Sequence, residues 1–311
     1  MIKRIRFLLH YLVEYKYSYC LGIIFIILTN WISVTIPEYL KRCIDLLNGD
    51  MRYLDQNRSL LSEYLMIMLV LAVSVIFVRS LSRIFFFNPG RAIEYSVKND
   101  IFKKLTLLQK EYYDKNPTGS IISRIQNDIN GIRMICGFGM MQIFNIITAL
   151  SFTPYKMWLL SPKLTIYIII PVILVFVILR FGMRFLIKGT KARMVDLQTI
   201  SSFIVSSLSG IDVIKGYNLF SWNLEQFDKQ NQKLKSISIR ISFYRSFLMP
   251  MLQNLENFLK IIILSIGGFY VINEGFSIGE LTAFIAYSAL LSMPIRGLGW
   301  LTTILETGMV G

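Results

Sequence analysis

Four polar side chains lie at helical spacing within an apolar stretch in the second half of the chain. They occupy positions i, i+3, i+4 and i+7 of one helical face, and they are Gln253, Glu256, Asn257 and Lys260. Ionisable groups inside a bilayer are costly unless they face a cavity or a partner. The pattern leaves two interpretations open: a polar surface that faces a transported substrate, or a Glu256–Lys260 ion pair packed between helices.

A further cation, Arg296, follows Pro294 in the last apolar stretch. Proline removes a backbone donor and opens the local helix, which favours a position for Arg296 along the inner half of a membrane pathway. The alternative is that the long side chain of Arg296 extends to the membrane–water interface. Together with the four residues above, Arg296 completes a candidate polar cavity.

The sequence offers no cluster of residues for metal, redox or covalent chemistry. Its single histidine is His10, and its three cysteines, Cys20, Cys43 and Cys136, are spaced too widely for a disulfide framework or a metal site. A membrane-embedded enzyme would need a cluster of histidine and carboxylate side chains, and none is visible. We therefore expect no catalytic residue and no metal.

The composition indicates a membrane protein. The 311 residues are 54% hydrophobic and only 17% charged, whereas soluble domains average about a quarter charged. Six apolar stretches are close to the roughly 20 residues that cross about 30 Å of hydrocarbon. We predict an all-α membrane protein of one domain, 1–311, that begins with an amphipathic elbow helix at about 1–16 on the membrane surface. The predicted spans are about 17–36, ended by Pro37, and then 64–87, 137–160, 164–187, 246–272 and 278–305. The connection 38–63 is compatible with an extended outer end of the first helix.

The net charge of +14 is typical of basic cytoplasmic loops and of contact with anionic lipid, and no stretch suggests nucleic-acid binding. Residues 1–16, 88–137 and 188–245 together hold 21 lysines and arginines, whereas the connections on the opposite side hold five. This bias predicts a multi-pass protein of the cell membrane with both termini in the cytoplasm.

Two polar insertions, at about 88–136 and 188–245, are helix-patterned and long. A continuous helix of about 45 residues would be roughly 70 Å long, more than twice the thickness of the hydrocarbon core. We predict that spans two to five continue as helices into the cytoplasm. Each insertion would then be a helical hairpin with a short element at its tip.

The first insertion contains a turn followed by an amphipathic helix. The turn is indicated by residues 114–119, which combine Asp, Asn, Pro and Gly. Isoleucines then recur at helical spacing, at Ile121, Ile122, Ile125, Ile129 and Ile132. This apolar stripe favours a docking surface for another protein. The alternative is a solvated connection whose isoleucines pack on helices of the same bundle.

These features resemble the transmembrane domain of an ATP-binding-cassette (ABC) exporter of the half-transporter type. Residues 112–119, followed by Ile122-Ser123-Arg124 and Asn127-Asp128, are similar to the first intracellular loop of that family. Residues 210–217, with Phe227 beyond them, are similar to its second loop, and residues 279–284 and 294–299 resemble parts of its sixth helix. The resemblance covers essentially the whole chain.

The resemblance implies that each hairpin tip is a short coupling helix that inserts into a groove of a nucleotide-binding domain. The first loop would contribute Tyr112, Tyr113, Asp114, Lys115, Asn116, Pro117, Thr118 and Gly119, and the second Asp212, Ile214, Lys215, Gly216 and Tyr217. In the family, an acidic residue usually follows the lysine of the second loop, whereas this chain has Leu219-Phe220-Ser221-Trp222. That departure puts a standard polar contact in doubt, or indicates a more apolar docking surface.

No G-x-x-x-x-G-K-[ST] phosphate loop occurs in the sequence. The resemblance therefore implies that ATP and Mg²⁺ bind not to this chain but to a nucleotide-binding domain, either a missing C-terminal part or a separate chain. It also implies a second transmembrane domain, identical or homologous. The expected function is half of the translocation pathway of an ATP-driven exporter. A non-transporting regulatory subunit and an inactive truncated product are the alternatives, and the substrate could be a lipid, a peptide or an amphiphilic drug.

Overall fold

The computed structural model describes the backbone of residues 10–48 and 54–310, and the side chains of these ranges except 54–57, 296 and 298–310. Over the described residues the chain is helical and contains no strand. Six helices are long and apolar enough to cross a membrane. The predicted fold class, an all-α membrane protein with six membrane-spanning helices, is confirmed.

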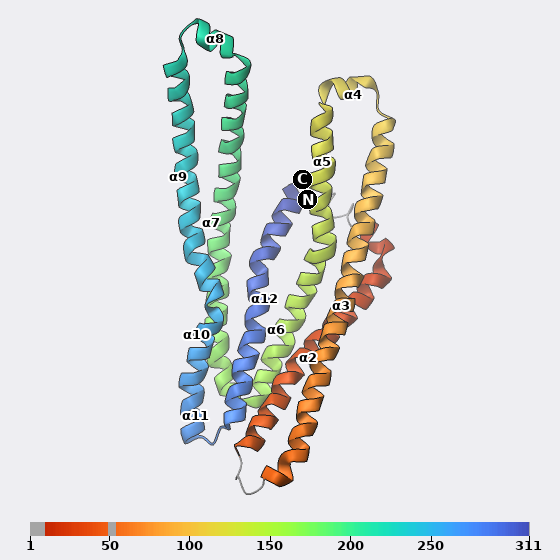
Figure 1. Cartoon of the computed structure of the whole chain (residues 1–311), viewed down its shortest axis with the longest axis vertical. Coiled ribbons are helices and arrows are strands. Elements are labelled where there is room, and N and C mark those ends of the chain that lie inside the picture. The colour runs from red at the N-terminus through yellow and green to blue at the C-terminus, as the bar shows by residue number, and fades with distance from the viewer. Residues whose placement is uncertain (1–9, 49–53, 311) are drawn as a thin grey trace. The chain divides into compact units, whose positions relative to one another are not determined.

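The helices are much longer than the apolar stretches that they contain. In chain order they are α2 (Lys16–Leu47), α3 (Leu54–Thr106), α4 (Lys110–Lys115), α5 (Thr118–Met134), η2 (Ile135–Gly139), α6 (Met140–Leu160), α7 (Pro162–Ser209), α8 (Ile211–Gly216), α9 (Phe220–Gln253), α10 (Leu255–Ile262), η3 (Ile263–Gly267), α11 (Gly268–Asn273) and α12 (Ile278–Val310) (Figure 1). The 53 residues of α3 correspond to about 80 Å, well over twice the hydrocarbon thickness. The predicted long extensions are therefore present.

The chain divides into two compact units, Met1–Ile169 with Glu256–Gly311, and Ile170–Leu255. In the first unit α2 packs against α3, and α12 packs along α2 and α6. One buried cluster lies where the N-terminal segment meets α3 and α5, and it consists of Tyr11, Ile93, Val97, Ile129 and Cys136. A second cluster between α2 and α3 consists of Tyr19, Ile26 and Phe86.

The N-terminal segment is helical over residues 10–14 and is tied to α3 by a buried tyrosine. The Tyr11 hydroxyl donates a 2.7 Å hydrogen bond to Oδ2 of Asp100. Burial, and then this bond to a carboxylate, raises the pKa of Tyr11 to about 12. Residues 1–9 of the predicted elbow helix lie outside the described residues.

The helix that contains the first predicted span continues past Pro37, the predicted end of that span. Pro37 lies inside α2, which continues to Leu47. A proline within a helix removes a backbone donor and disturbs the carbonyls of the preceding turn. One of these, the carbonyl of Val34, accepts a buried 3.1 Å hydrogen bond from the Tyr287 hydroxyl on α12. The carbonyl that loses its helical donor to Pro37 is that of Ser33, four residues earlier. The Tyr287 bond to Val34 lies in the same turn and joins α12 to α2 there.

Two single turns of π-helix, η2 and η3, interrupt the apolar stretches and were not predicted. In η2 the carbonyl of Cys136 accepts a buried 3.1 Å hydrogen bond from the Tyr19 hydroxyl. Here α3 also comes very close, since a Cβ built on Gly90 would lie 3.1 Å from Cα of Gly137. Only glycine allows two backbones to approach so closely. Such π-turns let a helix change register locally without leaving its packing.

A reciprocal cap fixes the start of α12. The Ser277 hydroxyl accepts a hydrogen bond from the Glu280 N–H, and the Ser277 N–H donates to the Glu280 carboxylate, both at 3.0 Å. This is a capping box, the S-x-x-E pattern that satisfies two orphan donors at a helix N-terminus. The same carboxylate forms a 2.7 Å ion pair with Lys41 of α2. The Gly279 N–H donates to Asp45 at 3.0 Å, so the end of α2 and the start of α12 are joined.

The second unit is a helical hairpin formed by α7 and α9 with α8 between them. The two long helices are joined by a 2.7 Å ion pair between Lys233 and Asp196. Phe185 and Tyr244 stack with ring centroids 5.8 Å apart. Gly182 and Gly189 leave room on α7 for Leu248 and Ile241 of α9. Small residues facing branched ones let the two helices pack along this stretch.

Candidate functional site

The tip of the first hairpin is a short helix, α4, that joins the ends of α3 and α5 (Figure 1). The helix contains Tyr112, Tyr113, Asp114 and Lys115, all of them exposed. The turn is shorter than predicted, because Asp114 and Lys115 complete α4 while Thr118 and Gly119 already belong to α5. Only Asn116 and Pro117 connect the two helices.

Local hydrogen bonds hold the exposed side chains of α4 in place. The Tyr113 hydroxyl donates to the carbonyl of Leu105 at 2.6 Å. The Asn116 backbone N–H and side-chain amide both donate to the carbonyl of Tyr112 at 3.0 Å, which closes the C-terminus of α4. The rings of Tyr112 and Tyr113 pack edge to face, 5.6 Å apart. The tip is therefore a hydrogen-bonded turn that presents aromatic side chains to solvent.

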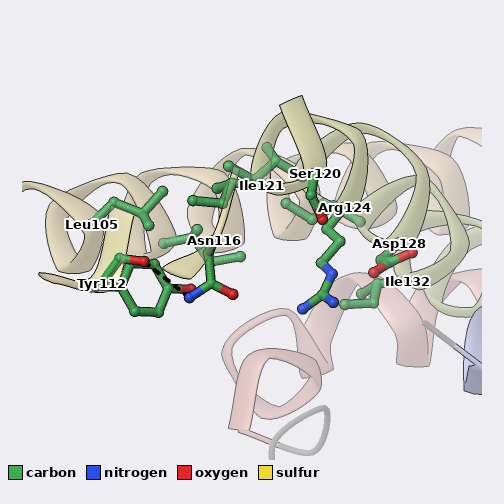
Figure 2. Close-up of a pocket in the computed structure, with 11 residues that line it drawn as sticks. Leu105, Tyr112, Asn116, Ser120, Ile121, Arg124, Asp128 and Ile132 are labelled. Carbon is green, nitrogen blue, oxygen red and sulfur yellow. Dashed lines mark hydrogen bonds between the residues drawn. The ribbon is translucent and has the colours of Figure 1, made fainter. Parts of the chain in front are cut away.

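A cavity of about 290 Å³ lies under this tip, between α3 and α5. Figure 2 shows Tyr112 and Asn116 at one end and Arg124 and Asp128 along α5. The isoleucines of the predicted stripe differ in their burial. Ile129 is buried in the core, Ile125 and Ile132 pack against it, and Ile122 remains half exposed. Packing within the bundle thus accounts for part of the stripe, and the tip itself is left open.

The tip of the second hairpin is α8, which contains Asp212, Ile214, Lys215 and Gly216. The chain leaves α8 through Asn218, whose φ of 52° lies in the left-handed region. The Leu219 N–H bonds to the Ile214 carbonyl at 2.9 Å, and the Asn218 N–H to the Lys215 carbonyl at 3.3 Å. This pair of bonds is a Schellman motif, which ends a helix and turns the chain sharply.

Large apolar side chains project from the second tip. Tyr217 is 78% exposed. The others, all more than half exposed, are Val213, Phe220 and Trp222. The aromatic residues occupy the segment in which the family pattern has an acidic residue. An exposed aromatic surface of this kind is typical of a protein contact site.

The structure separates the four polar residues of the predicted fifth span. Gln253 is the last residue of α9, whereas Glu256, Asn257 and Lys260 belong to α10. Asn254 lies between the two helices, and its backbone N–H and side-chain amide both bond to the Pro250 carbonyl, at 2.9 and 3.0 Å. The predicted continuous face is therefore interrupted.

Within α10, Glu256 and Lys260 form an ion pair of 2.8 Å, the contact of the second interpretation given above. The side chain of Arg296 lies outside the described side chains. Its neighbour Pro294 lines a cavity that contains neither Lys260 nor Glu256.

That cavity has a volume of about 420 Å³ and lies in the first unit. Its walls come from α2, α3, η2, α6 and α12, and its cationic members are Arg79 and Arg83 of α3. These two arginines were not among the site residues predicted from the sequence. Two charged residues four positions apart inside the apolar stretch 64–87 were the signal that could have identified them.

Comparison with known proteins identifies the family. Residues 19–295 match the family model of the ABC transporter transmembrane region. The chain belongs to this family. The predicted resemblance to an ABC transmembrane domain is thereby confirmed.

Two bacterial relatives illustrate how this ABC transmembrane region is related to whole transporters. The multidrug resistance-like ATP-binding protein MdlA of Buchnera aphidicola is 24% identical over 96% of the chain and 51% of its own length. The probable multidrug resistance ABC transporter ATP-binding/permease protein YheI of Bacillus subtilis is 24% identical over 94% and 50%. The chain thus spans about half the length of the curated relatives it matches.

Both hairpin tips and the cavity of this ABC transmembrane region lie within the matched residues. None of the described residues forms a group of three or more His, Cys, Asp or Glu side chains that could hold a metal ion. The chemistry that the described part of the ABC region presents is therefore that of surfaces and a polar cavity.

Proposed function

We propose that this chain is the membrane half of an ATP-driven exporter of the cell membrane. It pairs with a second transmembrane domain, identical or homologous, and contributes half of a translocation pathway through the lipid bilayer. Both termini and both hairpin tips face the cytoplasm, in agreement with the bias of 21 against five lysines and arginines. The names of the relatives, which include "ATP-binding" and "multidrug resistance", support this assignment.

The observation that carries the proposal is the pair of short exposed helices, α4 and α8, each at the tip of a hairpin of long helices. ATP can shift a conformational equilibrium only through contacts that differ between the two states. The tips offer such contacts to a nucleotide-binding domain, which either continues the polypeptide or is a separate chain, and which holds ATP and Mg²⁺. Long helices then carry a displacement of the tips into the membrane.

Cross-linking tests the contact at α4. A cysteine is introduced at Asn116 after the exposed Cys20 is replaced by serine, and the protein is treated with a bifunctional thiol–amine reagent together with its ATPase domain. The matched control is Tyr95→Cys. Tyr95 is 70% exposed and lies on α3 about 16 Å from the end of that helix at the hairpin tip. Mass spectrometry of linked peptides should identify ATPase peptides joined to residue 116 and not to residue 95. Absence of a link at residue 116 in every nucleotide state contradicts docking.

Transport itself is tested in sealed vesicles that contain the chain and the ATPase domain. An exporter moves substrate only when ATP is hydrolysed, whereas a regulatory partner leaves the substrate distribution unchanged. A fluorescent amphiphile is a suitable first probe, since both relatives named above are described as multidrug proteins.

A further inference from the structure

Two arginines of α3 lie in an apolar stretch and face the same cavity. Arg79 and Arg83 both line the cavity of about 420 Å³. With the cytoplasmic end of the predicted span at residue 87, Arg79 is about 12 Å inside the membrane. Among the ion pairs of the described side chains, none involves Arg79 or Arg83. A cation at that depth is costly unless an anion or water accompanies it.

The spacing of the two arginines adds to that cost. Residues at i and i+4 lie on the same face of a helix, and like charges at this spacing repel each other. A single anionic group between them offsets both charges and accepts hydrogen bonds from both guanidinium groups. Arginine is suited to this because its planar fork matches carboxylate and phosphate oxygens.

The other residues that line the cavity indicate the remaining chemistry of its ligand. No Asp or Glu is among the described lining residues, so the cavity holds no internal counter-ion. Its polar side chains include Ser33, Gln142 and Asn145. Apolar side chains complete the surface, namely Ile26, Val34, Phe138, Met141, Leu290 and Met293. This combination fits a molecule with an anionic end and an apolar remainder.

The polar wall is also held in a fixed arrangement. The Asn30 amide donates to Oδ1 of Asn145 at 3.1 Å and to the Thr148 hydroxyl at 2.7 Å, which joins α2 to α6. A cavity of a few hundred Å³ with few, fixed polar groups is typical of small-molecule sites.

We propose that this cavity binds the anionic headgroup of an amphiphile through Arg79 and Arg83. The proposal rests on the transport function above and names the substrate class for it. Amphiphiles that carry only a positive charge are excluded from the site by the two arginines.

Binding is tested by native mass spectrometry of the full chain in maltoside micelles, without nucleotide. Four probes are compared at equal concentration: dodecyl phosphate, dodecylphosphocholine, dodecyltrimethylammonium and inorganic phosphate. The three amphiphiles share one alkyl chain and differ in headgroup, which is anionic, zwitterionic and cationic in turn. Dodecyl phosphate should bind tightest. Equal binding of all three amphiphiles, or preference for the cation, overturns the proposal. If inorganic phosphate binds as tightly as dodecyl phosphate, the site binds free anions and the proposed amphiphilic ligand is wrong.

Substitution assigns the binding to the two arginines. Arg79→Gln and Arg83→Gln should each weaken dodecyl phosphate binding by about tenfold, the factor expected when a hydrogen bond to a charged group is lost. Arg79→Lys should retain most of the preference for the anion. Lys103→Gln is the control, because this substitution removes the same charge from an exposed position on the same helix. Unchanged binding in both Gln variants overturns the proposal.

The headgroup comparison on the unsubstituted chain decides the matter even if a Gln variant does not fold. Because binding is measured without ATP, a negative result here leaves the transport proposal standing. Equally, a failure of ATP-driven transport leaves a positive binding result intact.

Discussion

The hydroxyl of Ser18 on α2 donates a 3.0 Å hydrogen bond to the backbone carbonyl of Phe85 on α3. Four residues further along α3 stands Pro89, which has no N–H, so the Phe85 carbonyl has no partner within its own helix. A side chain of the neighbouring helix supplies the missing donor. In a membrane, where water does not replace a lost backbone bond, such contacts tie helices together at their prolines.

Removing the Ser18 hydroxyl should leave the Phe85 carbonyl unsatisfied. We expect Ser18→Ala to lower the free energy of unfolding by about 1–2 kcal/mol, the cost of an unpaired buried polar group. In a Pro89→Ala background the carbonyl regains a helical donor, so the same substitution should cost much less. Thermal unfolding of the four proteins of this double-mutant cycle measures the difference. Ser80→Ala is the control, since that hydroxyl bonds within its own helix; equal losses in both backgrounds would disprove the role of Pro89.

Glu280 serves both the cap of α12 and the ion pair with Lys41. We expect Glu280→Ala to lower stability by about 1–2 kcal/mol because both contacts are lost. Glu280→Gln keeps a cap acceptor and loses only the ion pair, whose partners are each about one-fifth exposed, so it should cost less than half as much. Chemical denaturation measures both values. A Gln variant as unstable as the Ala variant would indicate that the ion pair dominates.

Asn218 adopts the left-handed backbone conformation that ends α8. Replacement by alanine should cost about 1 kcal/mol, because a Cβ is unfavourable at positive φ and asparagine is among the few residues that tolerate it. Replacement by glycine should be neutral or slightly stabilising. Hydrogen exchange at the Leu219 amide, which bonds to Ile214, reports the local change. The prediction fails if Asn218→Gly exchanges as fast as Asn218→Ala.

The Tyr11–Asp100 contact should make stability depend on alkaline pH. The pKa of Tyr11 is raised from its usual value near 10 to about 12 in the folded state, so the unfolded chain releases this proton first. The stabilisation is therefore complete below pH 10 and is lost as the pH rises from about 10 to 12. The difference in unfolding midpoint between the unsubstituted protein and Tyr11→Phe should be constant below pH 10. Above it the difference should shrink, and a difference that does not change with pH would rule out the contact.

Much of the architecture was predictable because it depends on local pattern. Apolar length and a low content of charge defined six membrane helices, and the helical pattern of the polar insertions predicted their extension. Both features follow from transfer of residues into hydrocarbon and from helix geometry, which need no knowledge of neighbours. The residues of the two hairpin tips were assigned by resemblance to the ABC family. That they dock to an ATPase domain stays a prediction.

Other features depend on which helices are neighbours. Pro37 was expected to end the first span, and the structure places Tyr287 of α12, some 250 positions away in sequence, against the carbonyl of Val34 one turn before it. The predicted polar face of the fifth span is divided between α9 and α10, on either side of Asn254. Periodicity alone carries no information on contacts between helices or on the residue at which a helix is interrupted.

The sequence by itself determined that this protein is a bundle of membrane-spanning helices with two polar hairpins, because hydrophobicity and spacing are properties of each segment alone. Only the tertiary structure decided which polar groups of different helices meet. It placed Ser18 against Phe85 and left Arg79 and Arg83 facing a cavity. A charge or a carbonyl within the membrane must find its partner across helices, and that partner is set by packing rather than by position in the chain.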